Sequence, residues 1–302
     1  MTNVPLARID LKDRRFSLSY PPDDEDLRWS IATVGIVQPV ILLDRTPRIP
    51  VAGWRRLRCA RELRLREVPA IIVDLDEKTA LLRAIHDNLA RGFNIIEKAA
   101  AVQAMDRFGF SREEIFGLMA RLGLSPHEKV LSTFLRIASL DARSRDFIFR
   151  KNLSLRNVES FLRFEGKERR RILAALTGLR VTESTLREIL EMLELIRIRK
   201  GRLTGRDIPV MESSDILRAH LKQKTHPILS SLAKKLKAIR SAMALPPGLD
   251  IRVDPFLEKE YIDIIVKIGS EDDVEAALGK VSELVAAGHI RRILELTKGR
   301  IR

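Results

Sequence analysis

The stretch "VAGWRRLRCARELRLREVPAIIVD", residues 51–74, decides how the N-terminal part of the chain folds. It starts as a β-strand that reaches Gly53, turns into a helix with Leu57, Ala60 and Leu63 on one side, and returns to a strand. This alternation predicts a mixed domain in which a helix packs on a sheet. Arginines at three of the five positions after Gly53 are either solvated surface charge or one wall of a phosphate site.

Two physical effects favour an anion at this turn. The start of a helix offers free backbone N–H groups, and a glycine lets a phosphate approach the backbone closely. Arg55 and Arg56 add charged donors arranged as a fork. Arg58 lies one helical turn beyond Arg55 and is a weaker candidate. Taken alone, arginines at a helix start are typical of a solvated face.

The rest of residues 1–92 continues the same α+β domain. The expected strands are Val4–Leu11, Gln38–Leu43, Ile49–Val51 and Val68–Leu75, and the expected helices are Asp24–Val34, Arg55–Leu65 and Lys78–Asn88. Within the last of these helices and just after it, Asp87, Asn88 and Arg91 lie close together in sequence. A carboxylate and an amide can hold Mg²⁺ together with phosphate oxygens, although a plain helix end followed by a turn explains the same residues.

Composition narrows the class of protein. The chain has 302 residues, which suggests two or three domains, and 55 Lys+Arg against 41 Asp+Glu give a formal charge of +14. This charge favours nucleic acid as a partner. Aromatic residues make up only 5%, so contact with duplex phosphates is a better expectation than base stacking. A single cysteine, Cys59, fits a reducing cytoplasm, and neither a secretory signal nor a membrane-spanning run is recognisable.

Residues 93–200 are predicted to form a helical domain. Asn94 with Glu97, Ser111 with Glu114, and Ser125 with Glu128 have the spacing of capping boxes, with Pro126 expected at the first helical position. The segments 111–122 and 125–140, joined at residues 123–124, have the shape of a helix-turn-helix. The candidate DNA contacts are Ser125, His127, Lys129, Ser132 and Thr133 for base edges, and Arg121 and Arg136 for phosphates. Glu128 brings negative charge to this surface, and a helix-turn-helix that only packs remains the alternative.

The last third of the chain looks like a separate unit. Gly201, Gly205 and Pro209 interrupt residues 201–212, which are predicted to be a linker. Residues 213–302 then follow in the order α-β-β-α, with Tyr261–Ile268 as the candidate seam of a dimer. We therefore expect a chain lacking residues 213–302 to be a monomer.

Three ordered motifs resemble the ParB family of chromosome- and plasmid-partition proteins. They are "GIVQPV" at residues 35–40, "GWRRLRCA" at 53–60, and "DNLAR" at 87–91 followed by "NIIEKA" at 94–99. The resemblance implies an N-terminal α/β domain of the ParB/sulfiredoxin type that binds CTP and Mg²⁺, a helix-turn-helix domain, and a C-terminal dimerisation domain. It also implies a DNA clamp that closes with CTP and slides, a ParA-like ATPase as partner, and a cytoplasmic, nucleoid-associated location without a membrane.

Site residues carry over position by position. Gly53, Arg55 and Arg56 would cradle the triphosphate, with Trp54 inside the same motif. Asn88 would help to hold the metal, Arg91 would contact phosphate, and Gln38 would lie near the cytidine. The resemblance thus gives the nucleotide set Gln38, Gly53, Trp54, Arg55, Arg56, Asn88 and Arg91.

The chain departs from the family pattern at four of these motif positions. Trp54 stands where the family has glutamate, Asp87 replaces the other glutamate, Ala90 replaces glutamine and Ile95 replaces proline. Hydrolysis needs a polar group that orients water, so we expect CTP binding with weak or no hydrolysis.

Other functions fit the residues less well. A divergent transcription regulator or scaffold that has lost the nucleotide switch is the main alternative. No carboxylate cluster suited to two-metal phosphodiester cleavage is visible, which disfavours a nuclease. Sulfiredoxin chemistry needs a cysteine directly after the glycine turn, where Trp54 stands, and Cys59 is interpreted as a core residue.

Overall fold

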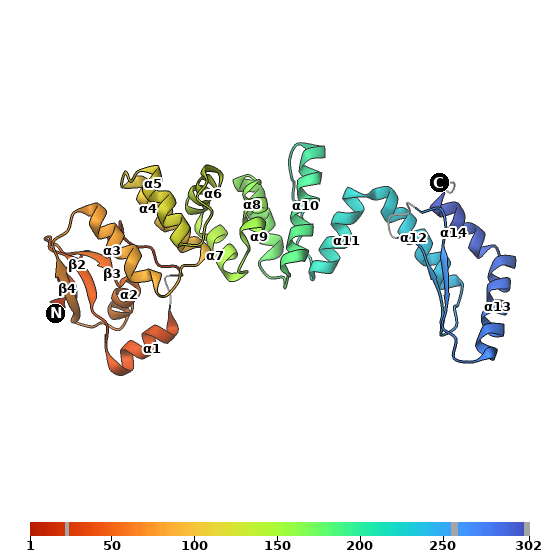
Figure 1. The fold of residues 1–302 in the computed structure, drawn as a ribbon, viewed down its shortest axis with the longest axis horizontal. Coiled ribbons are helices and arrows are strands. Elements are labelled where there is room, and N and C mark those ends of the chain that lie inside the picture. Colours follow the sequence, from red (N-terminus) through yellow and green to blue (C-terminus); the bar gives the residue numbers. More distant parts are fainter. Residues whose placement is uncertain (22–23, 255–258, 299–302) are drawn as a thin grey trace. The chain divides into compact units, whose positions relative to one another are not determined.

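The computed structural model describes residues 1–21, 24–254 and 259–298, and the chain divides into two compact units, Met1–Gly178 and Leu179–Arg302. Figure 1 labels the elements in chain order. The division falls inside the stretch predicted as one helical domain, so the predicted domain limits stay predictions. No helix in the described part of the chain is both long and apolar enough to cross a membrane.

A four-stranded sheet with the order β1-β4-β2-β3 organises the N-terminal domain. Its strands are β1 Thr2–Pro5, β2 Val40–Leu43, β3 Ile49–Ala52 and β4 Glu67–Val73. The central pair, β2 and β4, is parallel, whereas β1 and β3 join it antiparallel. All four residues of β2 are buried, which explains their unbroken apolar run.

Three helices complete this domain: α1 Glu25–Val34, α2 Trp54–Glu62 and α3 Glu77–Leu89. Asp24 caps α1 and Asp76 caps α3, each accepting a hydrogen bond from the backbone three residues on. Leu57 and Ala60 of α2 pack against the β2 and β4 side chains in one core. The predicted strand at the N-terminus is shorter than expected, because a 3₁₀ turn, Leu6–Arg8, interrupts it.

Six helices follow in the first unit: α4 Ile95–Arg107, α5 Arg112–Arg121, α6 Glu128–Ala138, α7 Ala142–Arg150, α8 Leu155–Leu162 and α9 Gly166–Leu176. The capping boxes of Asn94 with Glu97 and of Ser111 with Glu114 are present. The box predicted at Ser125 is wrong. His127 is the N-cap of α6, and Pro126 precedes the helix instead of starting it.

The second unit begins with α10 Glu183–Lys200 and α11 Ser214–Thr225, which pack against each other. The apolar side of α10 is buried and includes Leu186, Ile189, Leu190, Leu193 and Ile196. Residues 201–212 are more ordered than the predicted linker, because the buried Asp207 binds Lys200 and Thr204 and Ile208 is also buried.

The described part of residues 213–302 has the predicted α-β-β-α order with two additional helices, of which α11 comes first. The elements after α11 are α12 Pro227–Ala242, β5 Leu249–Arg252, β6 Asp263–Val266, α13 Glu271–Ala286 and α14 His289–Thr297. β5 and β6 form an antiparallel ribbon. A capping box of Ser270 with Asp273 starts α13, and Gly288, at φ 74°, separates α13 from α14.

Candidate nucleotide and DNA sites

Gly53 forms the turn between β3 and α2. Its φ is +90°, and a Cβ at this position would lie 2.8 Å from Cγ1 of Val40 and 3.2 Å from Nη2 of Arg56. Both the dihedral angle and the packing therefore require glycine. Helix α2 starts without a capping side chain, and the first N–H groups of a helix have no partner inside it.

Arg56 points back into the domain and not toward an open site. Its Nη1 donates to the backbone carbonyls of Gln38 and Pro39, the latter at 2.7 Å, and its Nη2 lies 3.6 Å from a carboxylate oxygen of Asp87. Burial lowers the pKa of the guanidinium, and the charge of Asp87 partly opposes that shift. Arg56 thus links the residues just before β2 with α2 and α3 and stabilises their packing. The side chain of Gln38 is exposed.

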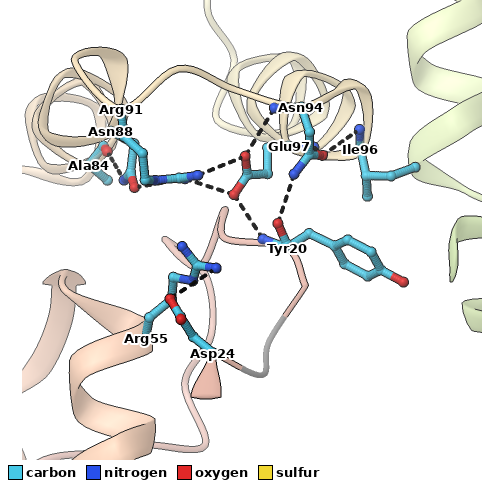
Figure 2. Close-up of polar contacts among 9 residues, drawn as sticks. All are labelled: Tyr20, Asp24, Arg55, Ala84, Asn88, Arg91, Asn94, Ile96 and Glu97. Carbon is cyan, nitrogen blue, oxygen red and sulfur yellow. Dashed lines mark hydrogen bonds and ion pairs between the residues drawn. The ribbon is translucent and has the colours of Figure 1, made fainter. Parts of the chain in front are cut away.

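Arg55 points to the other side of α2. Its Nη2 lies 3.2 Å from Asp24 at the start of α1 (Figure 2). Arg55 and Trp54 also line a pocket of about 90 Å³, and the guanidinium of Arg14 lies 6.0 Å from the centre of the Trp54 ring. The other lining residues are Leu11, Ser17, Ser19, Leu57, Arg58 and Arg61.

Arg91 belongs to a third group, centred on the buried carboxylate of Glu97. Arg91 Nη2 donates to Glu97 Oε1 at 2.7 Å, and the backbone N–H of Tyr20 reaches the same oxygen at 2.9 Å. The backbone N–H of Asn94 donates to Oε2 at 3.1 Å, and the Asn94 amide donates in turn to the Tyr20 carbonyl. Figure 2 shows these donors converging on Glu97 from α4, from the end of α3 and from the N-terminal loop.

The donor set does not fit the magnesium ion that the resemblance implies. The Asn88 amide donates to the Ala84 carbonyl at 2.8 Å, and its oxygen accepts from Arg91 at 3.3 Å. The nearby Asp87 carboxylate faces Arg56. Mg²⁺ needs oxygen ligands around it, but both candidate oxygens face guanidinium groups. Across the described residues, no three His, Cys, Asp or Glu side chains gather to hold a metal.

The structure therefore divides the predicted nucleotide set into three groups. Trp54 and Arg55 line the pocket beside α2, Gln38, Gly53 and Arg56 meet at the entry of β2, and Asn88 and Arg91 lie near Glu97. Sequence reasoning missed Arg14 and Arg61 in the pocket, although the pair Arg14–Arg15 was a visible signal. It identified Glu97 as a cap but not as the anchor of Arg91.

Cys59 is buried, with 3% of its surface exposed, as its interpretation as a core residue requires. Burial raises the pKa of the thiol, and the nearby Glu62 and Asp24 act in the same direction. A thiol in these surroundings is a poor nucleophile.

Helices α5 and α6 occupy the two segments predicted as a helix-turn-helix, and each of them packs against α4 (Figure 1). Ser125 and His127 lie in the connection before α6, and Lys129 and Ser132 are exposed on its first turns. Arg121 is exposed at the end of α5. Glu128 lies 3.5 Å from Arg112, which compensates its negative charge.

Two predicted DNA contacts have hydrogen bonds within the chain. Thr133 is buried, and its hydroxyl donates to the Lys129 carbonyl at 3.0 Å. Arg136 donates to the Leu162 carbonyl in the connection after α8. The burial of Thr133 does not support a base contact, whereas Arg136 is exposed and its phosphate contact stays a prediction.

Comparison with known proteins identifies the N-terminal domain. The model of the ParB N-terminal domain matches residues 3–89. A probable chromosome-partitioning protein ParB of Neisseria meningitidis is 29% identical over 164 residues, which are 52% of this chain and 56% of that protein. The chain thus matches little more than half the length of this relative.

Two solved structures of Caulobacter crescentus ParB, both truncated at the C-terminus, are also similar. The one complexed with CTP-gamma-S is 23% identical, covers 54% of this chain and 92% of its own, and has a TM-score of 0.27. The one complexed to the centromeric parS site is 19% identical, covers 63% and 92%, and has a TM-score of 0.35. The sequence matches carry the assignment of the N-terminal part alone: residues 3–89 match the ParB N-terminal domain, and the chain is similar to ParB proteins over about half its length.

Proposed function

We propose that the chain is a dimeric, CTP-responsive DNA-binding protein that acts in chromosome or plasmid partition. The observation that carries this proposal is a match to the ParB N-terminal domain, followed after α4 by the helix pair α5 and α6, in which the residues before α6 and on its first turn are polar and exposed. The formal charge of +14 supports a polyanionic partner. In this proposal the protein works at the nucleoid in the cytoplasm, with a ParA-like ATPase as partner.

DNA binding is assigned to the start of α6 and the end of α5. Ser125, His127, Lys129 and Ser132 would face base edges, and Arg121 would contact phosphate. These five side chains are exposed, which a reading surface requires. A helix-turn-helix that only packs would bury this surface.

CTP binding is assigned to α2 and its surroundings. The start of α2 at Gly53 offers backbone N–H groups to an anion, and Arg55 adds a charged donor. Arg91 would reach phosphate only by releasing Glu97, and Gln38 is exposed near the turn where the resemblance expects the cytidine. Nucleotide binding would then alter the hydrogen bonds of Glu97 that join the N-terminal loop to α4. Through these hydrogen bonds, CTP binding would change the position of the helices that follow.

Hydrolysis is proposed to be weak or absent. Trp54 has only an N–H donor and Ala90 has no polar group, so neither can accept a hydrogen bond from an attacking water, and the Asp87 carboxylate faces Arg56. Phosphate release no faster than that of Arg55→Ala is the expected result, and a clearly faster release would contradict it.

A second candidate is a regulator or scaffold whose switch is silent. It is favoured by one observation: each arginine predicted to bind phosphate already has a carboxylate partner within the chain. The pairs are Arg55 with Asp24, Arg56 with Asp87 and Arg91 with Glu97.

One experiment separates the two candidates. The purified protein is incubated with closed circular DNA or with the same DNA cut once, with or without CTP, and is then crosslinked. A clamp that slides accumulates on the closed circle only when CTP is present. Equal crosslinking on both DNAs, with no effect of CTP, supports the silent regulator.

The DNA site is tested by gel shift over a series of salt concentrations. Lys129→Ala should weaken binding to any duplex and lower the slope against log salt by about 1. Lys167→Ala, at a lysine on α9 outside the helix-turn-helix, is the matched control and should leave the slope unchanged. An unchanged slope for Lys129→Ala places the DNA surface elsewhere.

A further inference from the structure

The pocket beside α2 has an unusual set of lining side chains. Four of its nine lining residues are arginines, Arg14, Arg55, Arg58 and Arg61, and none of the nine is acidic. We call it the arginine pocket. Arg14, Ser17 and Ser19 come from the N-terminal loop and the other polar residues come from α2, so two separate segments converge on it. Its volume of about 90 Å³ exceeds what one water needs.

Ion pairs balance only part of the charge in the arginine pocket. Arg55 pairs with Asp24 at 3.2 Å and Arg58 with Glu62 at 3.0 Å. Neither carboxylate lines the pocket. The guanidinium of Arg14 lies over the ring of Trp54, an interaction that does not neutralise its charge. The pocket therefore keeps a positive potential that favours an anion.

Two buried donors at the arginine pocket lack an acceptor. Trp54 Nε1 and Arg55 Nε are inaccessible to solvent and have no hydrogen-bond partner within the described residues. Leaving a buried donor unpaired costs free energy, which a small rotation of either side chain toward an acceptor oxygen in the pocket would recover. Phosphate supplies several such oxygens, and the hydroxyls of Ser17 and Ser19 are further neutral donors.

The same chemistry disfavours a metal ion. A divalent cation would meet guanidinium groups in the pocket, and the Asp87 and Asn88 oxygens outside it already face Arg56 and Arg91. We propose that the phosphate chain of the nucleotide is held in the arginine pocket by arginine and indole donors, without a divalent cation. This inference rests on the proposed nucleotide binding and adds that the bound form is the metal-free polyphosphate.

The proposal fixes the sign of the magnesium effect. Mg²⁺ bound to a triphosphate removes negative charge and occupies oxygens that the arginines would contact. Binding should therefore be equally tight or tighter in EDTA than in MgCl₂ at matched ionic strength. A site that uses the metal shows the opposite order.

The two tryptophans of the chain provide a direct readout. Trp29 is 72% exposed on α1, so Trp29→Phe leaves Trp54 as the sole tryptophan. The fluorescence of this variant is titrated with inorganic triphosphate and with CTP, each in EDTA and in MgCl₂. Saturable binding of triphosphate in EDTA is the expected result, and binding that appears only with MgCl₂ overturns the inference.

Substitutions locate the site. In the Trp29→Phe background, Arg14→Ala, Arg55→Ala and Arg61→Ala should each weaken triphosphate binding by about tenfold, as expected for a lost charge-assisted hydrogen bond. Arg83→Ala, an exposed arginine on α3, removes the same charge outside the pocket and should change the affinity less than about twofold. Because Arg61 is exposed on α2, its variant keeps the test valid if Arg55→Ala misfolds. Equal affinities in all variants overturn the assignment to the pocket.

Failure of this inference and failure of the proposed function are distinguishable. If CTP binds only with MgCl₂, the proposed CTP response survives and the metal-free pocket is wrong. If triphosphate binds in EDTA but CTP binds no better, the pocket stands and the assignment of CTP is wrong.

Discussion

At the residue scale, Gly53 shows how one position combines backbone and packing requirements. Gly53→Ala would place a methyl group 2.8 Å from Val40 Cγ1 at a φ of +90°. We expect a loss of about 1–3 kcal/mol in the free energy of unfolding, the cost of a strained backbone position. Urea denaturation followed by tryptophan fluorescence measures it.

The matched control for Gly53→Ala is Gly117→Ala. Gly117 lies inside α5, and a Cβ there would meet nothing within 4 Å. Alanine in that helix should stabilise the protein by about 0.5–1 kcal/mol. Equal effects of the two substitutions would contradict the role given to the Gly53 turn.

Trp54 gives the second prediction at this scale. Trp54→Phe keeps an aromatic ring beneath Arg14 but removes the buried indole N–H that has no acceptor among the described residues. Removing an unpaired buried donor should leave the free energy of unfolding unchanged within about 1 kcal/mol. Triphosphate affinity, measured by calorimetry in EDTA, should fall severalfold. A variant that loses stability but binds normally would mean that the indole only fills space.

At the element scale, Asp207 organises the connection between α10 and α11. Its carboxylate accepts from Lys200 at 2.6 Å and from the Thr204 backbone at 2.9 Å, and only 1% of the side chain is exposed. Burial alone would raise the pKa of Asp207, but the hydrogen bonds from Lys200 and Thr204 outweigh it and hold the pKa well below its ordinary value of 3.8.

The direction of this shift sets the pH dependence of stability. Because the folded pKa lies below 3.8, the stabilisation is complete above that pH and disappears as the pH falls toward the folded pKa. Asp207→Asn should therefore destabilise α10 and α11 by about 2 kcal/mol at pH 7, and the deficit should shrink below about pH 4.

Hydrogen exchange of the α10 and α11 amides at pH 7 and at about pH 3 measures the effect of Asp207→Asn. Asp215→Asn is the control, since the Asp215 side chain is 84% exposed and its pair with Arg218 lies at the surface. A deficit of the same size at both pH values would contradict the assigned role of the carboxylate.

Local pattern predicted the elements better than it predicted their ends. The capping boxes at Asn94 and Ser111 were predicted correctly because each needs only a fixed spacing of two side chains. The same spacing failed at Ser125, since α6 begins at Glu128 after the extended residue His127. The spacing of two side chains does not reveal the backbone angles, and these angles determine which residue caps the helix.

At the scale of the whole molecule, the sequence could not predict which residues far apart in the chain form hydrogen bonds with each other. Arg56 is bound by carbonyls 17 and 18 positions away, and Glu97 accepts from the Tyr20 backbone 77 positions away. In the sequence, Arg55 and Arg56 belong to the same motif, and nothing distinguishes a structural role from a binding role. Only the fold shows that Arg56 donates a hydrogen bond to the backbone just before β2, whereas Arg55 lines a pocket.

The predicted dimer seam is tested best by a truncation that leaves the packing of α10 against α11 intact. Removing residues 213–302 would also strip α11 from α10, to which it is joined by ion pairs of Arg218 and Lys222 with Glu188. A chain ending at His226 keeps both helices and lacks only α12 and the elements after it. By light scattering, this chain should be a monomer at concentrations at which the full chain is a dimer.

A point substitution on β6 tests the same seam without truncation. An antiparallel ribbon of two strands is marginal alone, and an edge strand with exposed apolar side chains favours pairing with a second copy. Tyr261, Ile264 and Ile268 are 55%, 39% and 62% exposed, whereas Ile251 of β5 is fully buried in the local core. Ile264→Lys should therefore separate the dimer and leave that core folded, as helical circular dichroism would verify. A variant that stays dimeric would move the seam away from β6, to the apolar side of α12, where Leu229 and Leu236 line a second pocket.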